Sequence, residues 1–330
     1  MIRPGPRNSI TDVAGILVGN AELPELVTGV TAVIPDRPAI AAVDVRGGGP
    51  GTRETEALAA SSTVQEIHGV ALAGGSAYGL DAAGGVMHRL RQHGRGFAIG
   101  GAVVPIVPGA IIFDLATGGP KDWDHPPWWE LGRKAAEAAS SDFALGNAGA
   151  GLGAKAGKLK GGLGTASVQW DGLTLGALAV ANPVGSVVIP GTRTFWAWPF
   201  ELAGEFGGQT PPGAPPADLD HDFASPAGAN SGANTTLAVI ATDAALTRAQ
   251  AKRVALMAHD GYARAIRPVH TPLDGDTVFV LSTGAHPLAD PVADLARLGM
   301  LAADCVARAI TRGVYEASPL AGWPAYRDLA

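Results

Sequence analysis

Glycine residues gather in four dense clusters, and this distribution constrains the fold more than any other feature of the sequence. The chain holds 46 glycines in 330 residues, about twice the usual share of roughly 7%. They follow no regular repeat, which excludes collagen and solenoid folds. Because glycine lacks a Cβ atom, such clusters predict backbone packed closely around a site or an interface. They lie at residues 46–54, 72–80 and 146–164 and in the stretch before Asn234.

Two kinds of apolar run indicate a mixed fold. Runs rich in β-branched residues and bounded by turn residues predict strands at 29–34, 40–45, 70–73, 173–181, 235–242 and 277–283. Apolar residues at helical spacing predict helices at 76–93, 246–260 and 292–313, the second of which we expect to end at Gly261. Strands and helices do not alternate in a short regular pattern, so the sequence favours an α+β or layered α/β fold over a barrel.

A segment rich in proline and glycine leads into the strand predicted at 235–242. Residues 204–233 (GEFGGQTPPGAPPADLDHDFASPAGANSGA) hold too few apolar side chains for a core element, so we expect a flexible linker. The sequence TTLAVIATD that follows is typical of a buried strand. This is a suitable place for chain cleavage, because the loop can leave while the strand holds the new terminus.

Charge and cysteine content exclude several classes of function. The net charge is −6 and the basic residues are scattered, so we expect no nucleic-acid partner. The single cysteine, Cys305, lies in an apolar helical stretch and is expected to be a core thiol, which leaves no disulfide or cysteine metal site within the chain. The N-terminus lacks the apolar core of a signal peptide, and no apolar run is long enough to span a membrane. A cytoplasmic location is therefore the expectation.

The sequence GANTTLAVIATD places a candidate nucleophile at the start of the buried strand. A threonine hydroxyl is a weak nucleophile until a base takes its proton. If the chain is cut before Thr235, the new α-amino group becomes that base, with an ordinary pKa of about 7.7 to 8.0. The hydroxyl can make the cut itself, by attacking the carbonyl group of Asn234 to form an ester that water hydrolyses. Taken alone, the pattern is also that of an ordinary turn and strand.

Nine segments occur in a fixed order over nearly the whole chain: TDVAGILVGNAE, TGVTAVIPD, RGGGPGTRETEAL, LAGGSAYGLDAAGGVM, VPIVPGAIIFDL, AGKLKGGLGTAS, VANPVG, GANTTLAVIATD and RPVHTPLDGDTVF. Together they resemble the L-aminopeptidase/D-esterase family, which includes β-aminopeptidases and 6-aminohexanoate-oligomer (nylon-oligomer) hydrolases. The resemblance implies one catalytic domain over residues 1–330 with a layered αββα fold of the N-terminal-nucleophile hydrolase type. It also implies self-cleavage into an α chain (1–234) and a β chain (235–330), and a homotetramer of αβ units.

Position by position, the resemblance assigns roles to three residues. Thr235 matches the nucleophile, and a threonine between asparagine and threonine resembles the nylon-oligomer branch, since the aminopeptidase branch typically has serine. Asn182 in VANPVG matches the asparagine whose amide stabilises the oxyanion, although it also suits a turn before proline. Lys158 in AGKLKGG matches the catalytic lysine of the nylon-oligomer branch. Lys160 follows two residues later, so the register between the two lysines stays open.

Asp274 and Asp276 in LDGDTVF match the paired carboxylates of the same branch. Their spacing can direct both side chains to one side of a strand entry, where they orient the terminal ammonium and the hydroxyl of Thr235. A DGD turn or a calcium loop is the alternative, but too few oxygen ligands follow for an EF-hand. His270 is interpreted as a structural hydrogen-bonding residue and not as a ligand. We therefore expect no metal and no cofactor.

Four further residues are candidates for the substrate pocket: Phe113, Gly74, Gly75 and Ser76. Phe113 stands where characterised members of the family have a tyrosine near the oxyanion, and it has no hydroxyl to donate. The other three form the tight entry of a predicted helix whose N-terminus faces the substrate. Ser76 is a rival nucleophile, but no GxSxG turn surrounds it, and the glycine spacing does not match a dinucleotide site.

These inferences favour an amide hydrolase that acts through an acyl-enzyme on Thr235. The expected substrates are nylon-type 6-aminohexanoate oligomers, short peptides, β-peptides and amino acid amides, and membranes are not expected as partners. Two alternatives stay open. One is an acyltransferase of the glutamate N-acetyltransferase type, which shares threonine self-cleavage, and the other is an uncleaved structural or binding relative.

Overall fold

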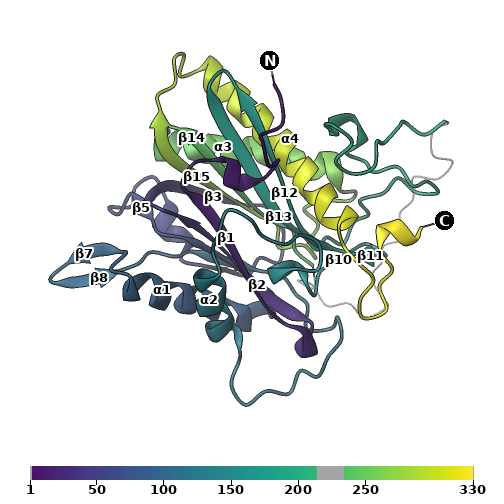
Figure 1. The fold of residues 1–330 in the computed structure, drawn as a ribbon, viewed down its shortest axis with the longest axis horizontal. Helices are drawn as coiled ribbons and strands as arrows, with labels where there is room; N and C mark the ends of the chain where they lie inside the picture. The colour runs from purple at the N-terminus through teal and green to yellow at the C-terminus, as the bar shows by residue number, and fades with distance from the viewer. Residues whose placement is uncertain (1, 214–233, 330) are drawn as a thin grey trace.

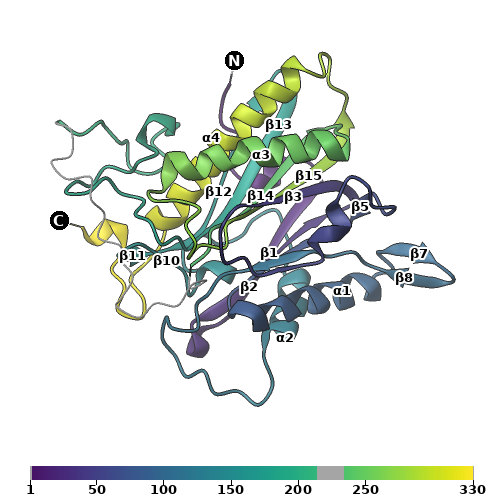
Figure 2. The ribbon, with the colours of Figure 1, turned by 180° about the vertical axis from the view of Figure 1, so that it is seen from behind.

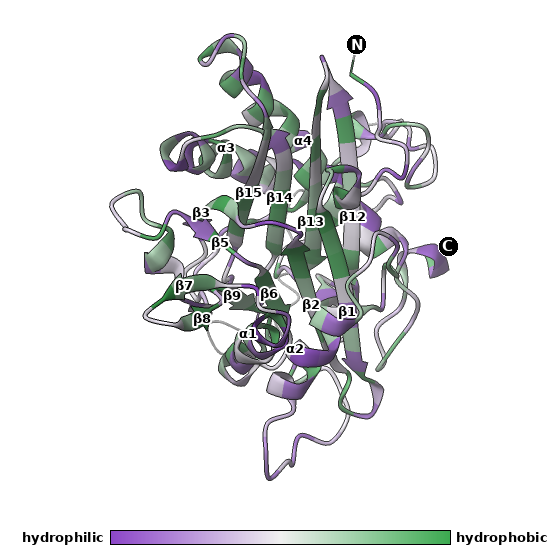
Figure 3. Cartoon of the chain, turned by 60° about the vertical axis from the view of Figure 1, so that its left-hand side comes forward, coloured by the Kyte–Doolittle hydropathy of each residue, from purple (hydrophilic) through white to green (hydrophobic). Residues whose placement is uncertain are grey.

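Two β-sheets are stacked face to face, with a pair of helices covering the outer face of each (Figure 1). The structure, a computed structural model, describes residues 2–213 and 234–329. Figure 3 shows the same order of layers from the side, with apolar residues concentrated in the strands between the helices. The αββα fold implied by the resemblance is therefore confirmed. The helices are α1 (Ala82–Gln92), α2 (Trp128–Glu137), α3 (Arg248–Ala265) and α4 (Ala293–Tyr315).

The sheet that carries the candidate nucleophile has six strands in the order β12-β13-β14-β15-β3-β5. Neighbouring strands are antiparallel except β14 and β15, which are parallel. Every residue of β13 and β14 is buried, because α3 and α4 cover one face of this sheet (Figure 2) and the second sheet covers the other. The bounds are β12 (Gly162–Trp170), β13 (Leu173–Ala181), β14 (Leu237–Ala244), β15 (Thr277–His286), β3 (Ala39–Val45) and β5 (Glu66–Ile67).

The second sheet has five strands in the order β1-β2-β6-β9-β4, and α1 and α2 pack on its outer face. Two short hairpins, β7–β8 and β10–β11, lie outside both sheets. The bounds are β1 (Ile16–Leu23), β2 (Thr28–Pro35), β4 (Thr52–Arg53), β6 (Val70–Ala73), β7 (Phe97–Ile99), β8 (Ala102–Val104), β9 (Gly109–Ile111), β10 (Lys155–Ala156) and β11 (Leu159–Lys160).

All six predicted strands and all three predicted helices are present, but the long strands β1 and β12, the helix α2 and the short strands β4, β5 and β7–β11 were not expected. Glycine interrupts the apolar pattern in both of the long missed strands because a helix packs directly on their backbones. A Cβ atom on Gly19 of β1 would lie 2.0 Å from the carbonyl oxygen of Ala135 in α2. One on Gly164 of β12 would lie 2.1 Å from that of Ala309 in α4. Close helix packing therefore requires glycine in these strands, and glycine interrupts the apolar pattern that predicts a strand.

The predicted end of the second helix is wrong, because α3 continues through Gly261 to Ala265. Gly261 faces α4, where an added Cβ atom would lie 2.2 Å from the carbonyl oxygen of Ala303. This glycine permits the close approach of two helices and does not mark a helix stop. The first predicted helix also differs at its start, since Ser76–Asp81 form a 3-10 helix before α1.

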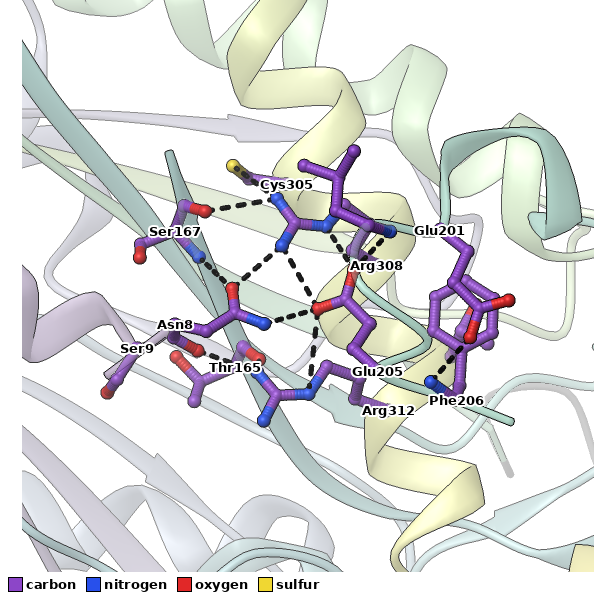
Figure 4. A network of polar contacts seen from close by, with 12 residues as sticks. Asn8, Ser9, Thr165, Ser167, Glu201, Glu205, Phe206, Cys305, Arg308 and Arg312 are labelled. Carbon is purple, nitrogen blue, oxygen red and sulfur yellow. Dashed lines mark hydrogen bonds and ion pairs between the residues drawn. The ribbon is translucent and has the colours of Figure 1, made fainter. Parts of the chain in front are cut away.

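The predicted flexible linker at 204–233 is described only in part, and its beginning contradicts the prediction. Residues 214–233 lie outside the described residues. Before them, Phe206 is fully buried, with its ring 5.8 Å from that of Phe195. The side chain of Glu205 is 5% exposed and pairs with Arg308 of α4 (Figure 4). The buried side chain of Phe206 and the ion pair of Glu205 anchor this stretch to the core. The composition of the whole segment does not reveal two such residues.

The helices test two expectations from the sequence, the burial of Cys305 and the lack of a membrane-spanning segment. Cys305 is fully buried in α4, as predicted, and burial raises the pKa of its thiol to about 12. A thiol with this pKa stays protonated at neutral pH and is a poor nucleophile. No helix in the described part of the chain has both the length and the apolar character needed to cross a membrane.

Candidate active site

Thr235 lies two residues before the start of β14, at the end of the six-stranded sheet where three predicted segments meet. Because β13 is antiparallel to β14, Asn182, which follows β13, lies beside the start of β14. Because β15 is parallel to β14, Asp274 and Asp276, which precede β15, lie on its other side. The topology of the sheet therefore brings these four predicted residues together.

The peptide bond between Asn234 and Thr235 is buried and held by hydrogen bonds on both sides. The two residues are 8% and 1% exposed. The amide N–H of Thr235 donates to the backbone carbonyl of Asn182 (2.9 Å), and the carbonyl oxygen of Asn234 accepts from the N–H of Gly275 (3.0 Å). The hydroxyl oxygen of Thr235 lies 2.5 Å from the same carbonyl oxygen. A nucleophile thus lies beside a carbonyl group that a backbone donor already polarises.

Only glycine fits between the two aspartates. A Cβ atom on Gly275 would lie 2.5 Å from the hydroxyl oxygen of Thr235 and 2.7 Å from the carbonyl oxygen of Gly49. Gly47 packs as closely on Asp274, since a Cβ atom there would lie 2.2 Å from its carbonyl oxygen. The glycine cluster at 46–54 therefore packs against this site, as the sequence predicted for such clusters.

The side chain of Asn182 is fully buried but only half satisfied. Its Oδ1 accepts from the backbone N–H of Lys155 (2.9 Å). Among the residues that the structure describes, none accepts a hydrogen bond from its Nδ2 amide. A buried donor without an acceptor costs about 1–3 kcal/mol, so such groups are rare without a reason. The unpaired amide suits the oxyanion role that the resemblance assigns to Asn182.

Asp274 is surrounded by donors. Its carboxylate accepts from the N–H of Val184 (3.0 Å) and from both the N–H (3.0 Å) and the hydroxyl (2.6 Å) of Thr271. Burial raises the pKa of Asp274 and the charge of Asp276 raises it further, while these hydrogen bonds oppose the rise. In the uncut chain its carboxylate contacts Val184 and Thr271, whereas from the sequence we expected the paired carboxylates to orient the terminal ammonium and the hydroxyl of Thr235.

Asp276 connects the residue after the nucleophile to a histidine. Its Oδ1 accepts from the N–H of Thr236 (2.8 Å), and its Oδ2 accepts from the N–H (3.2 Å) and Nδ1 (2.8 Å) of His270. The interpretation of His270 as a structural hydrogen-bonding residue agrees with these contacts. Within residues 2–213 and 234–329, no group of three or more histidine, cysteine, aspartate or glutamate side chains is arranged to hold a metal ion.

The two candidate lysines differ in burial. Lys158, to which the resemblance assigned the catalytic role, is exposed at the turn between β10 and β11. Lys160 is fully buried, and its Nζ donates to the carbonyl oxygens of Gly151 (2.9 Å) and Gly161 (2.8 Å). Burial lowers the pKa of Lys160 to about 7, against a smaller opposing effect from the charge of Asp114. Of the two lysines that can match the catalytic lysine of the family, Lys160 is therefore the one that lies inside the protein.

Gly74 and Gly75 enclose a buried carboxylate that sequence reasoning missed. Asp114 is fully buried and accepts from the N–H of Gly75 (2.8 Å) and the hydroxyl of Thr28 (2.7 Å). Burial raises the pKa of Asp114 to about 6. A Cβ atom on Gly74 would lie 1.9 Å from a carboxylate oxygen of Asp114, so this glycine accommodates an internal acid. An aspartate directly after the apolar run AIIF was the available signal, because acidic residues are seldom fully buried without a partner.

The remaining pocket candidates lie next to this carboxylate. Phe113 follows β9 closely and is partly buried. Ser76 begins the 3-10 helix, and its N–H donates to the carbonyl oxygen of Ile112 (3.0 Å). In the described part of the chain, no histidine hydrogen-bonds to the hydroxyl of Ser76. Thr235 is therefore the stronger candidate for the nucleophile.

Known proteins resemble this chain over most of its length. An uncharacterised aminopeptidase of Mycobacterium tuberculosis is 50% identical over 98% of this chain and 98% of that protein. A 6-aminohexanoate-oligomer endohydrolase of Paenarthrobacter ureafaciens is 32% identical over 82% of this chain and 74% of that protein.

The fold is also shared. The L-aminopeptidase D-Ala-esterase/amidase from Ochrobactrum anthropi, whose structure is described as a variant of the N-terminal-nucleophile hydrolase fold, matches with a TM-score of 0.66 at 24% identity. The match covers 95% of this chain and 87% of that one. The sequence profile of peptidase family S58 matches residues 8–326. The chain therefore belongs to peptidase family S58, a family of hydrolases that act on amide bonds.

Proposed function

We propose that the chain cuts itself between Asn234 and Thr235 and then hydrolyses amide bonds with Thr235 as its N-terminal nucleophile. The geometry of the junction carries this proposal. A buried threonine hydroxyl lies 2.5 Å from the carbonyl oxygen of the residue before it. That oxygen also accepts a hydrogen bond from the N–H of Gly275.

Self-cleavage begins as an acyl shift. The hydroxyl oxygen of Thr235 bonds to the carbonyl carbon of Asn234, and the N–H of Gly275 stabilises the negative charge that develops on the carbonyl oxygen. The C–N bond breaks as the hydroxyl proton passes to the amide nitrogen of Thr235. The product is an ester and a free amino group. Water hydrolyses the ester, which leaves a carboxylate on Asn234 and restores the hydroxyl of Thr235.

The cut site then turns over substrate with the same residues. The new amino group of Thr235 stays against the carbonyl oxygen of Asn182, which this nitrogen contacts at 2.9 Å in the uncut chain. The amine takes the hydroxyl proton, the oxygen attacks the substrate carbonyl carbon, and the proton passes to the leaving amine. The Nδ2 amide of Asn182 stabilises the oxyanion, which is worth about 2.7–4 kcal/mol for one well-placed donor. Water hydrolyses the acyl-enzyme.

Of the two lysines, we assign the supporting role to Lys160, whose amine carries a positive charge below its pKa of about 7. The side chain of Lys160 is fully buried, whereas Lys158 is an exposed residue. A cation in a low-dielectric interior acts over a longer range than one in water. A positive charge beside the terminal amine would favour the neutral form of that amine, which is the form that acts as a base.

Linear amides are the proposed substrates. The relative that is 50% identical is named as an aminopeptidase, and the one that is 32% identical is named as a 6-aminohexanoate-oligomer endohydrolase. Both names refer to cleavage of amide bonds. They support short peptides, amino acid amides and 6-aminohexanoate oligomers as the compounds to test. An acyltransferase would pass the acyl group to an added amine in place of water, so product analysis with and without an amine acceptor separates the two activities.

Purified protein is expected to contain two chains, the smaller of which begins at Thr235 and ends at Ala330. Intact mass spectrometry measures both chains, and N-terminal sequencing of the smaller one is expected to read Thr-Thr-Leu. A full-length chain alone after long incubation would contradict self-cleavage and favour an uncleaved relative. A processed protein that hydrolyses none of the three substrate classes would remove the substrate assignment only.

Self-cleavage is expected to slow at acid pH as Asp274 takes up a proton. Its three contacts are all with donors, so the site fits the ionised form. Because burial and the charge of Asp276 raise the pKa of Asp274, the rate is expected to fall at a pH above the ordinary aspartate value of about 3.9. Asp276→Asn removes the like charge, which lowers the pKa of Asp274 and moves this acid limb to lower pH.

The measurement is the rate of self-cleavage of freshly synthesised chain at a series of acid pH values. The acid limb is the pH range over which this rate falls, and its position does not depend on the absolute rate. Asp290→Asn is the control, because it removes a charge from an exposed position and is expected to leave the limb in place. A limb that stays in place or moves to higher pH in Asp276→Asn would contradict its assignment to Asp274.

A further inference from the structure

We propose that His270 is a positioning residue for self-cleavage that acts through Asp276. This inference rests on the proposed cleavage before Thr235. His270 gives two hydrogen bonds to one oxygen of Asp276, from its backbone N–H (3.2 Å) and from its Nδ1 (2.8 Å). The other oxygen of Asp276 accepts from the N–H of Thr236 (2.8 Å). One carboxylate therefore connects the histidine to the peptide group that directly follows the nucleophile.

The backbone of His270 adopts an unusual conformation at this contact. Its φ is 54°, in the left-handed region that residues other than glycine seldom adopt. Such conformations cost free energy, and they cluster at functional sites. Here the conformation accompanies a double contact in which the backbone N–H and the ring nitrogen reach the same oxygen of Asp276. The unfavourable backbone thus coincides with the placement of two donors on one carboxylate.

Two buried rings support the ring of His270. The ring of His259 lies 4.8 Å away at an interplanar angle of 75°, and that of Tyr262 lies 5.5 Å away at 37°. The hydroxyl oxygen of Tyr262 is 3.2 Å from the carbonyl oxygen of Thr236 and 2.9 Å from that of Thr277. Tyr262 therefore contacts both the ring of His270 and the backbone at the start of β14 and β15.

His259 is itself fixed by acceptors. Its Nε2 lies 3.2 Å from the carbonyl oxygen and 3.1 Å from a carboxylate oxygen of Asp44, so this nitrogen carries a proton. Burial lowers the pKa of His259 to about 4, which keeps the ring neutral at neutral pH. Asp44 pairs in turn with Lys252 (2.7 Å) and Arg46 (3.0 Å). A polar network thus leads from the surface to His259, whose ring packs against that of His270 and limits its movement.

Loss of the ring would leave Asp276 with fewer donors and able to rotate away from Thr236. The peptide group after Thr235 would then be less well fixed, and with it the hydroxyl that attacks Asn234. A misplacement of about 1 Å between reacting groups costs roughly 100-fold in rate. We therefore expect the ring of His270 to matter for the rate of cleavage more than for the fold.

His270→Gly tests the ring alone, because glycine adopts a positive φ without strain and keeps the backbone N–H. Self-cleavage of freshly synthesised chain, followed by intact mass spectrometry, is expected to slow by about 10- to 100-fold. Added imidazole is expected to restore part of the rate, since the side chain of His270 is 19% exposed and its removal leaves a space of matching shape. His270→Asn tolerates positive φ and can donate to Asp276, so it is expected to cut faster than His270→Gly.

Asp171→Gly is the matched control. Asp171 has a φ of 48° in the exposed turn between β12 and β13, at the opposite end of β13 from Asn182. The same backbone change there is expected to leave the rate unchanged, with or without imidazole.

Three outcomes separate the explanations. Wild-type cleavage in His270→Gly would show that the ring is not needed and would overturn the inference. A slow rate that neither imidazole nor His270→Asn improves would assign the ring to packing and would also overturn it. A wild-type chain that stays uncut would instead overturn the proposed function.

Discussion

Thr235→Ala is expected to abolish self-cleavage and to leave a folded, full-length chain. The substitution removes the hydroxyl that lies 2.5 Å from the carbonyl oxygen of Asn234. The backbone contacts of the junction with Asn182 and Gly275 remain, because they involve only main-chain atoms. The residue precedes β14 and has a small side chain, so we expect the free energy of unfolding to change by no more than about 1 kcal/mol.

Intact mass spectrometry and circular dichroism test both halves of this expectation. Thr235→Ser keeps the hydroxyl and is expected to be cut, more slowly because it loses the methyl group that restricts χ1. Thr236→Ala keeps the N–H that binds Asp276 and is expected to be cut at close to the wild-type rate. Two chains from Thr235→Ala would place the nucleophile elsewhere, with Ser76 as the next candidate.

Strands could be predicted from sequence where their apolar pattern is nearly continuous. β13 has the predicted bounds, Leu173–Ala181, because helices cover one face and a second sheet the other, so almost every position is apolar. β12 pairs with β13 along its whole length but was missed. Its glycines lie under α4, and a local pattern does not distinguish glycine in a buried strand from glycine in a turn.

The candidate site could be predicted only at residues with a local signature or a family counterpart. Thr235 follows an unusual linker and opens an apolar strand, so both signals coincide there. The β10–β11 hairpin decides which lysine points inward, and the sequence does not reveal that it is Lys160. The contact of His270 with Asp276 depends on a positive φ, which the sequence RPVHTPLDGD does not specify.

Glu205→Ala is expected to lower the free energy of unfolding by about 3–5 kcal/mol, the usual effect of breaking a buried ion pair. Glu205 accepts from Nε (2.5 Å) and Nη2 (3.0 Å) of Arg308, and the two side chains are 5% and 1% exposed. Figure 4 shows Asn8 and Arg312 completing the network around the carboxylate. Without the carboxylate, the guanidinium of Arg308 stays buried but loses its counter-charge.

Urea unfolding in the Thr235→Ala background measures this effect on a chain that stays in one piece. Glu316→Ala is the control, since its pair with Arg327 is exposed (33% and 52%) and is expected to contribute at most about 1 kcal/mol. Replacing both buried charges, with Glu205→Leu and Arg308→Met together, is expected to recover much of the loss. Equal decreases in the free energy of unfolding for Glu205→Ala and Glu316→Ala would show that the buried ion pair stabilises the protein no more than the exposed one.

The buried pair has a further consequence for the processed protein. Glu205 precedes the proposed cut and Arg308 follows it, so their ion pair joins the two chains once the bond before Thr235 is broken. In the wild-type background, Glu205→Ala is therefore expected to release the smaller chain at a lower urea concentration, as measured by size-exclusion chromatography. Release at the same concentration in both proteins would assign the cohesion of the cut molecule to the sheet instead. There, β14 and β15 of the smaller chain pair with β13 and β3 of the larger one.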